Sequence, residues 1–336
     1  MRPELLTYCS CPNCNAKDLT ICDNTQTDTG HVITGRINCA QCKQTYPIER
    51  GIPLFFGSLS KEVQSNVSNF GNQWLTYSKL LEENQLEFNS YFEGSGFSPE
   101  AMTGKIILDA GCGAGKFAYL SAQYPNSTII GMDLSHATLA AFESTKHLPN
   151  VHIIQADILN PPFADETFDF IYSIGVLHHT ENPPLSFSTL MKKLKPNAQF
   201  FFWLYSKEGN ELYLNVVDPF RKHLFCHLPH WLNNIVAWVL ACLTWPILLL
   251  YGFIDACVGQ KDKLKQALPM YEYLLYFRKA GFWLWRNTIL DKMIKQRRES
   301  IKQYEAANRD DLRICSRVNH CILTVGSVAR GSNDDY

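Results

Sequence analysis

The sequence predicts an α/β fold in which a parallel sheet of repeated β–α units carries two additions, a small cysteine-rich domain before it and an apolar helical insertion after it. Three observations lead to this prediction. Residues 104–205 alternate short apolar runs with amphipathic segments, residues 1–57 hold six of the twelve cysteines, and residues 206–270 contain a long stretch without charge. We assign residues 58–103 to a helical linker and residues 271–336 to the returning part of the α/β domain.

Composition fits one main globular domain with additions. The chain has 336 residues, of which 46% are hydrophobic and 19% charged. A formal net charge of −1 gives no overall attraction to phosphates, so we do not expect nucleic acid as a partner; a local basic patch is the alternative. The first residues lack the apolar core of a signal peptide, which predicts a cytoplasmic protein. No feature of the sequence indicates an oligomeric state.

The N-terminal cysteines have the spacing of metal ligands. Two Cys-x2-Cys turns, with 24 residues between them, supply the four thiols of Cys11, Cys14, Cys39 and Cys42. Four thiolates complete the tetrahedral shell of Zn²⁺ and leave no open position, so the predicted zinc is structural. Cys9 and Cys22 are alternative ligands, and a set of reduced, metal-free thiols is the competing interpretation.

The β–α region contains five strand candidates, and a further β-like run follows near the C-terminus. They are Lys105–Ala110, Thr128–Asp133, Val151–Ala156, Phe168–Ile174, Gln199–Tyr205 and Cys321–Ala329.

A glycine-rich loop after the first of these strands predicts the cofactor. Glycine at alternate positions, as in Gly111 and Gly113, lets the backbone approach a ligand closely. The dinucleotide fingerprint requires a third glycine where this chain has Lys116. Asp109 at the strand end opposes a pyrophosphate and favours a ligand with an ammonium and a sulfonium, S-adenosylmethionine.

Two further acids end the next strands. Asp133 lies 22 residues after Gly111, about where a carboxylate can take the ribose hydroxyls of an adenosine. Asp157 and the apolar Ile158 end the third strand and suit the adenine amino group and ring face. Each acid alone could be a helix cap or turn residue, but together with the glycine loop they indicate a cofactor site.

Residues 104–205 resemble class I methyltransferases of the small-molecule type, including those of quinone biosynthesis. The motifs that carry the resemblance are ILDAGCGAGKF, IIGMDLS, QADILNPPFADETFDFIYSIGVLHH and LKPNAQFFFW. The resemblance implies a Rossmann-like seven-stranded methyltransferase sheet whose last two strands form an antiparallel pair. It also implies cofactor contacts at Asp109, Gly111, Cys112, Gly113, Asp133, Leu134, Asp157, Ile158, Ser173 and Gly175. The stretch Tyr46–Pro53 resembles the end of Trm112-like zinc ribbons that are fused to, or partnered with, methyltransferases.

A histidine pair follows the fourth strand, near where the transferred methyl should point. Methyl transfer is an in-line displacement that depends mainly on alignment. An acceptor hydroxyl also needs a general base, for which imidazole has a suitable pKa. His178 and then His179 are the catalytic candidates, and the alternative is that one of them caps a helix or packs against the loop.

Trp231–Ile254 contains 24 residues without a charge, enough to span a bilayer. A single crossing conflicts with Arg278–Phe282, which resembles the turn before the sixth strand of the same sheet. Because proline breaks helices, Pro246 predicts two shorter helices, His230–Leu243 and Ile247–Cys257, as a hairpin that enters one leaflet. We therefore expect peripheral membrane contact through residues 228–258; a lid over an apolar acceptor, a dimer interface and core are the alternatives.

The sequence predicts a methyltransferase that transfers a methyl group from S-adenosylmethionine to a small-molecule or lipid-like acceptor. One alternative is an RNA base methyltransferase whose zinc ribbon helps to hold the RNA. A second alternative, from another class, is a non-catalytic subunit that binds the cofactor and stabilises a partner.

Overall fold

The computed structural model describes residues 1–26, 30–56, 98–203, 228–257, 271–293 and 320–324, with residues 85, 88, 89, 91, 224 and 225. The chain divides into two compact units, Met1–Tyr205 with Arg298–Tyr336 and Ser206–Arg297. Most of the expected helical linker, residues 58–103, lies outside the described residues. The finer division of the chain into five segments stays a prediction.

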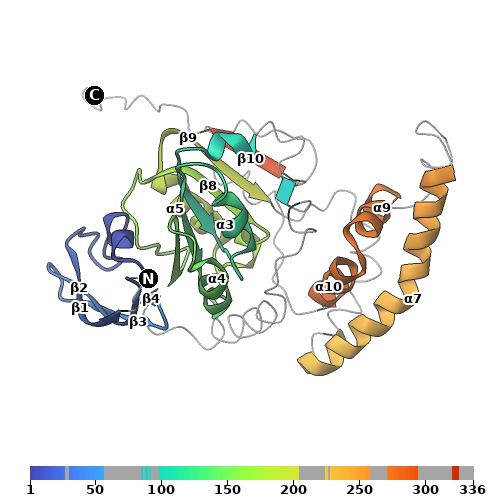
Figure 1. Cartoon of the computed structure of the whole chain (residues 1–336), viewed down its shortest axis with the longest axis horizontal. Coiled ribbons are helices and arrows are strands. Elements are labelled where there is room, and N and C mark those ends of the chain that lie inside the picture. Colours follow the sequence, from blue (N-terminus) through green and yellow to red (C-terminus); the bar gives the residue numbers. More distant parts are fainter. Residues whose placement is uncertain are drawn as a thin grey trace, which may run out of the picture. The chain divides into compact units, whose positions relative to one another are not determined.

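The first unit is built on a ten-stranded sheet with the order β1-β2-β3-β4-β7-β6-β5-β8-β9-β10 (Figure 1). Strands β5 to β9 are parallel to their neighbours, and β10 runs antiparallel to β9. This arrangement confirms the predicted α/β class. The strands are β1 (Leu19–Gln26), β2 (Val32–Cys39), β3 (Thr45–Glu49), β4 (Ile52–Phe55), β5 (Ile106–Ala110), β6 (Thr128–Asp133), β7 (Val151–Ala156), β8 (Phe168–Ile174), β9 (Leu194–Trp203) and β10 (His320–Thr324).

Helices cover both faces of the parallel part of this sheet. On one face, α3 (Lys116–Ser121) and α4 (Thr138–Thr145) pack against Ile107 and its neighbours. On the other face, α5 (Pro183–Lys193) packs against Leu108 and its neighbours. Because helices and neighbouring strands cover β7 on both faces, all six of its residues are buried, including the polar His152 and Gln155.

The cysteine-rich segment extends the same sheet. Strands β1 to β4 form antiparallel pairs, and β4 then pairs in parallel with β7, with Leu54 opposite Gln155 and Phe55 opposite Ala156. The α-amino group of Met1 donates to Val32 O at 2.8 Å. The segment therefore joins the edge of the parallel sheet and does not form a separate body.

The predicted strands agree with the structure where buried runs define them. Thr128–Asp133, Val151–Ala156 and Phe168–Ile174 have the predicted bounds. The fifth begins earlier, because Leu194 already pairs with Phe168. Against the seven expected strands, the described part of the α/β domain contributes six, and the four strands of the cysteine-rich segment bring the sheet to ten.

The second unit contains three described helices, α7 (His230–Cys257), α9 (Tyr271–Ala280) and α10 (Phe282–Met293). The expected break at Pro246 is wrong, because α7 is one helix with the proline inside it. Proline removes a single backbone hydrogen bond, and packing of adjacent side chains compensates for its loss. Trp245 packs edge-on against Phe282 at 5.3 Å between ring centroids, and Leu248 is fully buried.

The expected turn at Arg278–Phe282 before a sixth strand is also wrong. Gly281 takes a φ of 101° and donates its N–H to Phe277 O at 3.0 Å, so it ends α9. The next residue begins α10. Residues 282–293 therefore continue the helical unit, and the next described segment, β10, is the one that pairs with the sheet.

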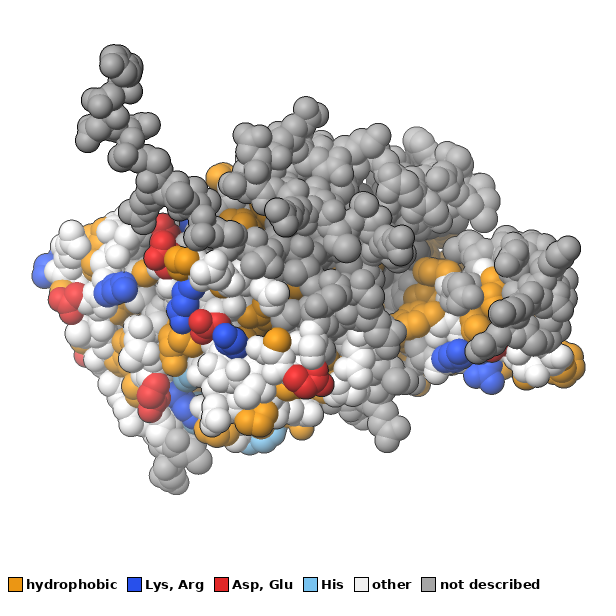
Figure 2. Space-filling view, turned by 90° about the horizontal axis from the view of Figure 1, so that it is seen from above, with side chains coloured by type: hydrophobic (Ala, Val, Ile, Leu, Met, Phe, Trp, Pro, Cys, Tyr) orange, Lys and Arg blue, Asp and Glu red, His pale blue; other side chains and the backbone are white. Residues whose placement is uncertain are grey.

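Charged side chains of both signs are interspersed over the face of the first unit that Figure 2 shows. In the second unit, Trp231–Cys257 is a stretch of 27 helical residues that is long and apolar enough to cross a membrane.

Candidate functional site

The glycine loop between β5 and α3 has no room for a side chain at Gly111 or Gly115. Gly111 has a φ of 94°, and a Cβ at this position would overlap the side chain of Val176. Its N–H donates to Met132 O at 2.7 Å, which ties the loop to β6. The backbone is thus held close to the carboxyl ends of its neighbouring strands, an arrangement that exposes main-chain groups to a ligand.

Asp133 ends β6 and bridges two backbone segments. One carboxylate oxygen accepts from the N–H of Gly113 at 2.9 Å, and the other accepts from the N–H of Ser135 at 2.7 Å. Each oxygen retains lone pairs after these bonds, so the carboxylate can still accept from hydroxyl groups. The next residue, Leu134, accepts at its carbonyl from the Gln155 amide at 2.8 Å, which links β6 to β7.

Asp109 is buried beneath the loop, with an exposed fraction of 2%. Burial raises the pKa of its carboxyl to about 8, and the nearby Asp133 also raises it, whereas a hydrogen bond with Tyr172 opposes the shift. The Asp109 Oδ2 atom has no hydrogen-bond partner among the described residues. The sequence interpretation assumed a fixed negative charge here, but in the ligand-free protein this carboxyl is mostly neutral at pH 7.

Asp157 and Ile158 follow β7 directly. Asp157 accepts from the N–H of Leu159 at 2.9 Å, and burial raises the pKa of its carboxyl. Ile158 is buried, with an exposed fraction of 6%. Strand β7, which ends just before Asp157, also pairs with β4. The cysteine-rich segment therefore contacts the same end of β7 that Asp157 and Ile158 follow.

Strand β8 brings the last cofactor candidates beside the loop. The Ser173 hydroxyl is buried and donates to Ala110 O at 2.7 Å. Gly175 has a φ of 74° and donates its N–H to Trp203 O at 3.1 Å. The predicted residues thus lie at or just after the carboxyl ends of four adjacent strands, β7, β6, β5 and β8. Ligands of open α/β sheets bind at this edge.

The sequence analysis overlooked Tyr172, which sits on β8 opposite Asp109 in the sheet. Its hydroxyl lies 3.1 Å from the Ser121 hydroxyl of α3 and is fully buried. A polar ring within the apolar strand run FDFIYSI was the available signal, since a buried tyrosine hydroxyl needs a partner.

The histidine pair occupies a short helical turn, Leu177–His179, after β8. The two imidazole rings lie 3.9 Å apart between centroids. His178 is buried with an exposed fraction of 1%, and His179 is half-buried. Of the two, His179 is therefore the one that an acceptor can reach without a change in structure.

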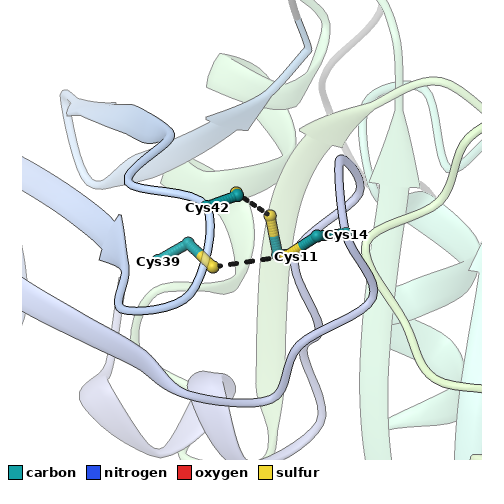
Figure 3. A group of neighbouring side chains, drawn as sticks. All are labelled: Cys11, Cys14, Cys39 and Cys42. Carbon is teal, nitrogen blue, oxygen red and sulfur yellow. Dashed lines mark hydrogen bonds between the residues drawn. The ribbon is translucent and has the colours of Figure 1, made fainter.

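The four predicted metal ligands come together. The Sγ atoms of Cys11, Cys14, Cys39 and Cys42 all lie within 4.8 Å of one another (Figure 3). Two of the separations are 3.5 Å, for Cys11 and Cys42, and 3.6 Å, for Cys14 and Cys39. A tetrahedral zinc with bonds of about 2.3 Å places its sulfurs roughly 3.8 Å apart, so the donor set fits this metal.

The two cysteine turns have the same backbone geometry. Asn15, with a φ of 60°, donates to Cys11 O at 2.7 Å, and Lys43, with a φ of 61°, donates to Cys39 O at 3.0 Å. The alternative ligands are elsewhere: Cys9 forms an isolated bridge with Phe163. Neither it nor Cys22 belongs to the group of four thiols.

The segment that contains the glycine loop is similar to known proteins. Residues 108–202 match the methyltransferase domain family. A tRNA U34 carboxymethyltransferase from Pseudoalteromonas atlantica is 27% identical over 33% of this chain and 35% of its own length. A tRNA (carboxymethyluridine(34)-5-O)-methyltransferase from Saccharomyces cerevisiae is 40% identical over 23% of this chain and 25% of its own length. The chain thus spans about a third or less of these two curated relatives.

A solved structure and a second family model also match parts of the chain. The solved structure of an S-adenosylmethionine dependent methyltransferase from Mesorhizobium loti is 30% identical over 30% of this chain and 46% of that chain, with a TM-score of 0.28. Residues 286–324 also match the Yqey-like protein family.

The relatives overturn one expectation of the sequence analysis. A small-molecule or lipid-like acceptor was expected from the resemblance and the apolar insertion, and the near-neutral net charge and the same insertion counted against nucleic acid, yet several relatives are named for the modification of transfer RNA. Net charge is a sum over the whole chain, whereas contact with RNA depends on the charges at one surface. The exclusion of nucleic acid was therefore wrong.

The matching segment covers β5 to β9 and includes every residue from the glycine loop to the histidine pair. Residues 108–202 of this chain form a methyltransferase domain of the class I, S-adenosylmethionine-dependent type.

Proposed function

We propose that this chain is an S-adenosylmethionine-dependent methyltransferase whose acceptor is RNA, with transfer RNA as the first candidate. One observation carries the proposal: several relatives of this chain are named for transfer-RNA modification, and the acids and glycines at the carboxyl ends of β5 to β8 lie in the segment that matches the methyltransferase domain family. Such an enzyme acts where transfer RNA is present, in agreement with the cytoplasmic location that the sequence predicts.

The site fits the cofactor through two features. The positive φ of Gly111 and its close contact with Val176 hold the loop backbone at the carboxyl ends of the strands, and Asp109 Oδ2 is a buried acceptor without a partner among the described residues. In this proposal Asp133 accepts from the ribose hydroxyls, Asp157 accepts from the adenine amino group, and Ile158 contacts the adenine face. S-adenosylmethionine, when bound, supplies a methyl group on a cationic sulfonium.

Asp109 takes the ammonium group in this proposal. A buried carboxyl whose pKa is about 8 ionises when a cation is brought next to it, since an opposite charge favours the ionised form. The proton leaves to solvent, and the resulting carboxylate is neutralised by the ligand. A pyrophosphate would instead stabilise the protonated form and gain no ionic attraction.

In this proposal the histidine pair, His178 and His179, acts on the methyl acceptor and not on the cofactor. His179, which is half-buried, is assigned to orient the acceptor and, for a hydroxyl or amine, to take its proton. His178 lies within the protein and holds the neighbouring ring in place. If the acceptor is a carboxylate, no proton needs to move, and the pair has only the positioning role.

Zinc holds the cysteine-rich segment in shape in this proposal. Four thiols from two turns complete its shell, so the metal takes no part in methyl transfer. Through β4 the segment braces the end of β7, and Asp157 comes immediately after that strand. The same segment adds protein surface next to the catalytic domain, where it can contact RNA.

The acceptor class is tested by incubating the purified, zinc-loaded chain with S-adenosylmethionine labelled at the methyl group. Separated transfer RNA, total lipid and small-metabolite fractions are offered in parallel. Label in the transfer RNA, abolished by ribonuclease, supports the proposal. Label confined to another fraction refutes RNA as the acceptor, and binding of cofactor without label in any fraction supports the non-catalytic alternative.

A further inference from the structure

Helix α7 turns an apolar surface to the outside of its unit. Every exposed residue between Trp231 and Cys257 is apolar, and we call these residues the α7 outward face. Leu243, Phe253 and Trp231 have exposed fractions of 67%, 66% and 63%. Large apolar surfaces of this kind mark interaction sites, because leaving them in water is unfavourable.

The polar groups of α7 lie on its opposite side, against α9 and α10. The indole N–H of Trp285 donates to the Thr244 hydroxyl at 2.7 Å, and the Tyr271 hydroxyl donates to Asp255 at 2.7 Å. Asn233 is buried and donates to Phe225 O at 3.0 Å. A helix facing water has the reverse distribution, with apolar groups inside and polar groups outside.

The neighbouring helices decide how α7 can meet a membrane. They run back along it, since Tyr271 contacts Asp255 near one end and the Arg286 guanidinium lies 5.5 Å from the Trp238 ring near the other. Arg278 lies beside Gly252, where an added Cβ would be 3.1 Å from the arginine side chain. If α7 crossed a bilayer, it would carry both arginines into the hydrocarbon, which is costly.

An orientation parallel to the bilayer surface avoids this cost. The 27 residues of the apolar stretch are about 40 Å long, against about 30 Å for the hydrocarbon core. With the helix lying flat, the α7 outward face enters the acyl region, while Arg278 and Arg286 stay on the side away from lipid. A protein interface normally has a polar rim, whereas Trp231–Ile254 has no charge along its whole length.

We propose that α7 is a monotopic membrane-docking helix that lies in the plane of a lipid bilayer and buries its outward face in one leaflet. The inference is independent of the acceptor, since it concerns the second unit alone. It differs from the hairpin expected from the sequence, because α7 is continuous and α9 and α10 cover its polar side.

Flotation with preformed vesicles tests this inference on the full zinc-loaded chain. The vesicles are phosphatidylcholine, with and without phosphatidylglycerol. Two variants alter the outward face, Leu243→Glu with Leu250→Glu, and Ile235→Glu with Phe253→Glu, at positions exposed by 51% to 67%. Leu185→Glu, exposed by 49% on α5 of the other unit, is the matched control.

We expect the wild type and the control to float with vesicles, and each double variant to show at least a tenfold smaller bound fraction. Cofactor affinity measured on the same samples should be equal, which shows that the methyltransferase domain is intact. The inference is overturned if the wild type does not float, or if both double variants float as well as it does. It is equally overturned if light scattering shows a lipid-free wild-type dimer that the variants dissociate, because a second copy would then cover the face.

Discussion

The carboxylate of Asp133 accepts a hydrogen bond from the backbone N–H of Gly113 at 2.9 Å, and so fixes the end of β6 to the glycine loop that follows β5. The bond joins the two elements that the proposal assigns to the ribose and to the amino-acid part of the cofactor. One side chain therefore shapes the site and, in the proposal, also binds the ligand. Its substitution should affect both binding and stability.

Asp133→Asn removes the charge but keeps the size of the side chain. Hydrogen bonds to a charged group contribute about 1.5–3 kcal/mol, so we expect the affinity for S-adenosylmethionine to fall roughly 10- to 100-fold. Isothermal titration calorimetry measures the change. The melting temperature should also fall, because asparagine keeps only one oxygen that can accept from the N–H groups of Gly113 and Ser135. Asp165→Asn, at an exposed carboxylate paired with Lys193, is the control and should bind normally. Equal affinity in both variants would remove Asp133 from the site.

Asp109 gives a pH dependence with a definite sign. Its pKa is about 8 in the free protein and should fall when the cofactor ammonium is adjacent. Binding at pH 7 should then release close to one proton, and affinity should rise with pH up to about 8. Calorimetry in two buffers of different ionisation enthalpy measures the proton count. Asp109→Asn should abolish the release; a release that persists in this variant would place the proton elsewhere.

Much of this site could be predicted from the sequence, because its parts are local. The run before Asp109, the glycines after it and the acids that end the next two strands all lie within short segments, and parallel strands bring their carboxyl ends to one edge. The ionisation state of Asp109 could not be predicted, since it depends on burial by α3 and β8.

Removal of zinc should weaken cofactor binding from a distance. Without the metal, β4 loses its support and its pairing with Gln155 and Ala156 should loosen, next to Asp157. We expect Cys39→Ser to lose the zinc, to raise amide hydrogen exchange in β7 and to lower cofactor affinity several-fold. Cys22→Ser, outside the group of four thiols, should change none of these. Normal exchange in β7 of the zinc-free protein would show that the segment does not brace the strand.

The pairing between the cysteine-rich segment and β7 could not be predicted from the sequence. The Cys-x2-Cys spacing predicted which four thiols come together, but the pairing of β4 with β7 joins residues about a hundred positions apart, and no local pattern encodes such a partner. The same holds for α7. Pro246 predicted a break from its own chemistry, whereas the packing of Trp245 and Leu248 against α9 and α10 keeps the helix continuous.

His152 predicts acid sensitivity of the first unit. Burial lowers the pKa of this side chain to about 4, well below the value of about 6.5 in an unfolded chain. The unfolded state therefore binds the extra proton first, and stability present above pH 6.5 is lost as the pH falls toward 4, by at most about 3 kcal/mol. Urea unfolding at a series of pH values gives the free energy of unfolding as a function of pH. Between pH 4 and 6.5, the slope of this function should be smaller in His152→Gln than in the wild type, by the equivalent of one proton. His147→Gln, at an exposed position, controls for zinc loss at low pH and should keep the wild-type slope.

In the proposed site, a carboxyl beside the glycine loop selects a cationic amino-acid nucleoside. Calorimetry on the folded, zinc-loaded chain tests it most directly, with S-adenosylmethionine, its demethylated product and NAD as ligands. We predict saturable binding of the first two at one site per chain and no heat with NAD. Binding of NAD, or no heat with either nucleoside, would contradict the account.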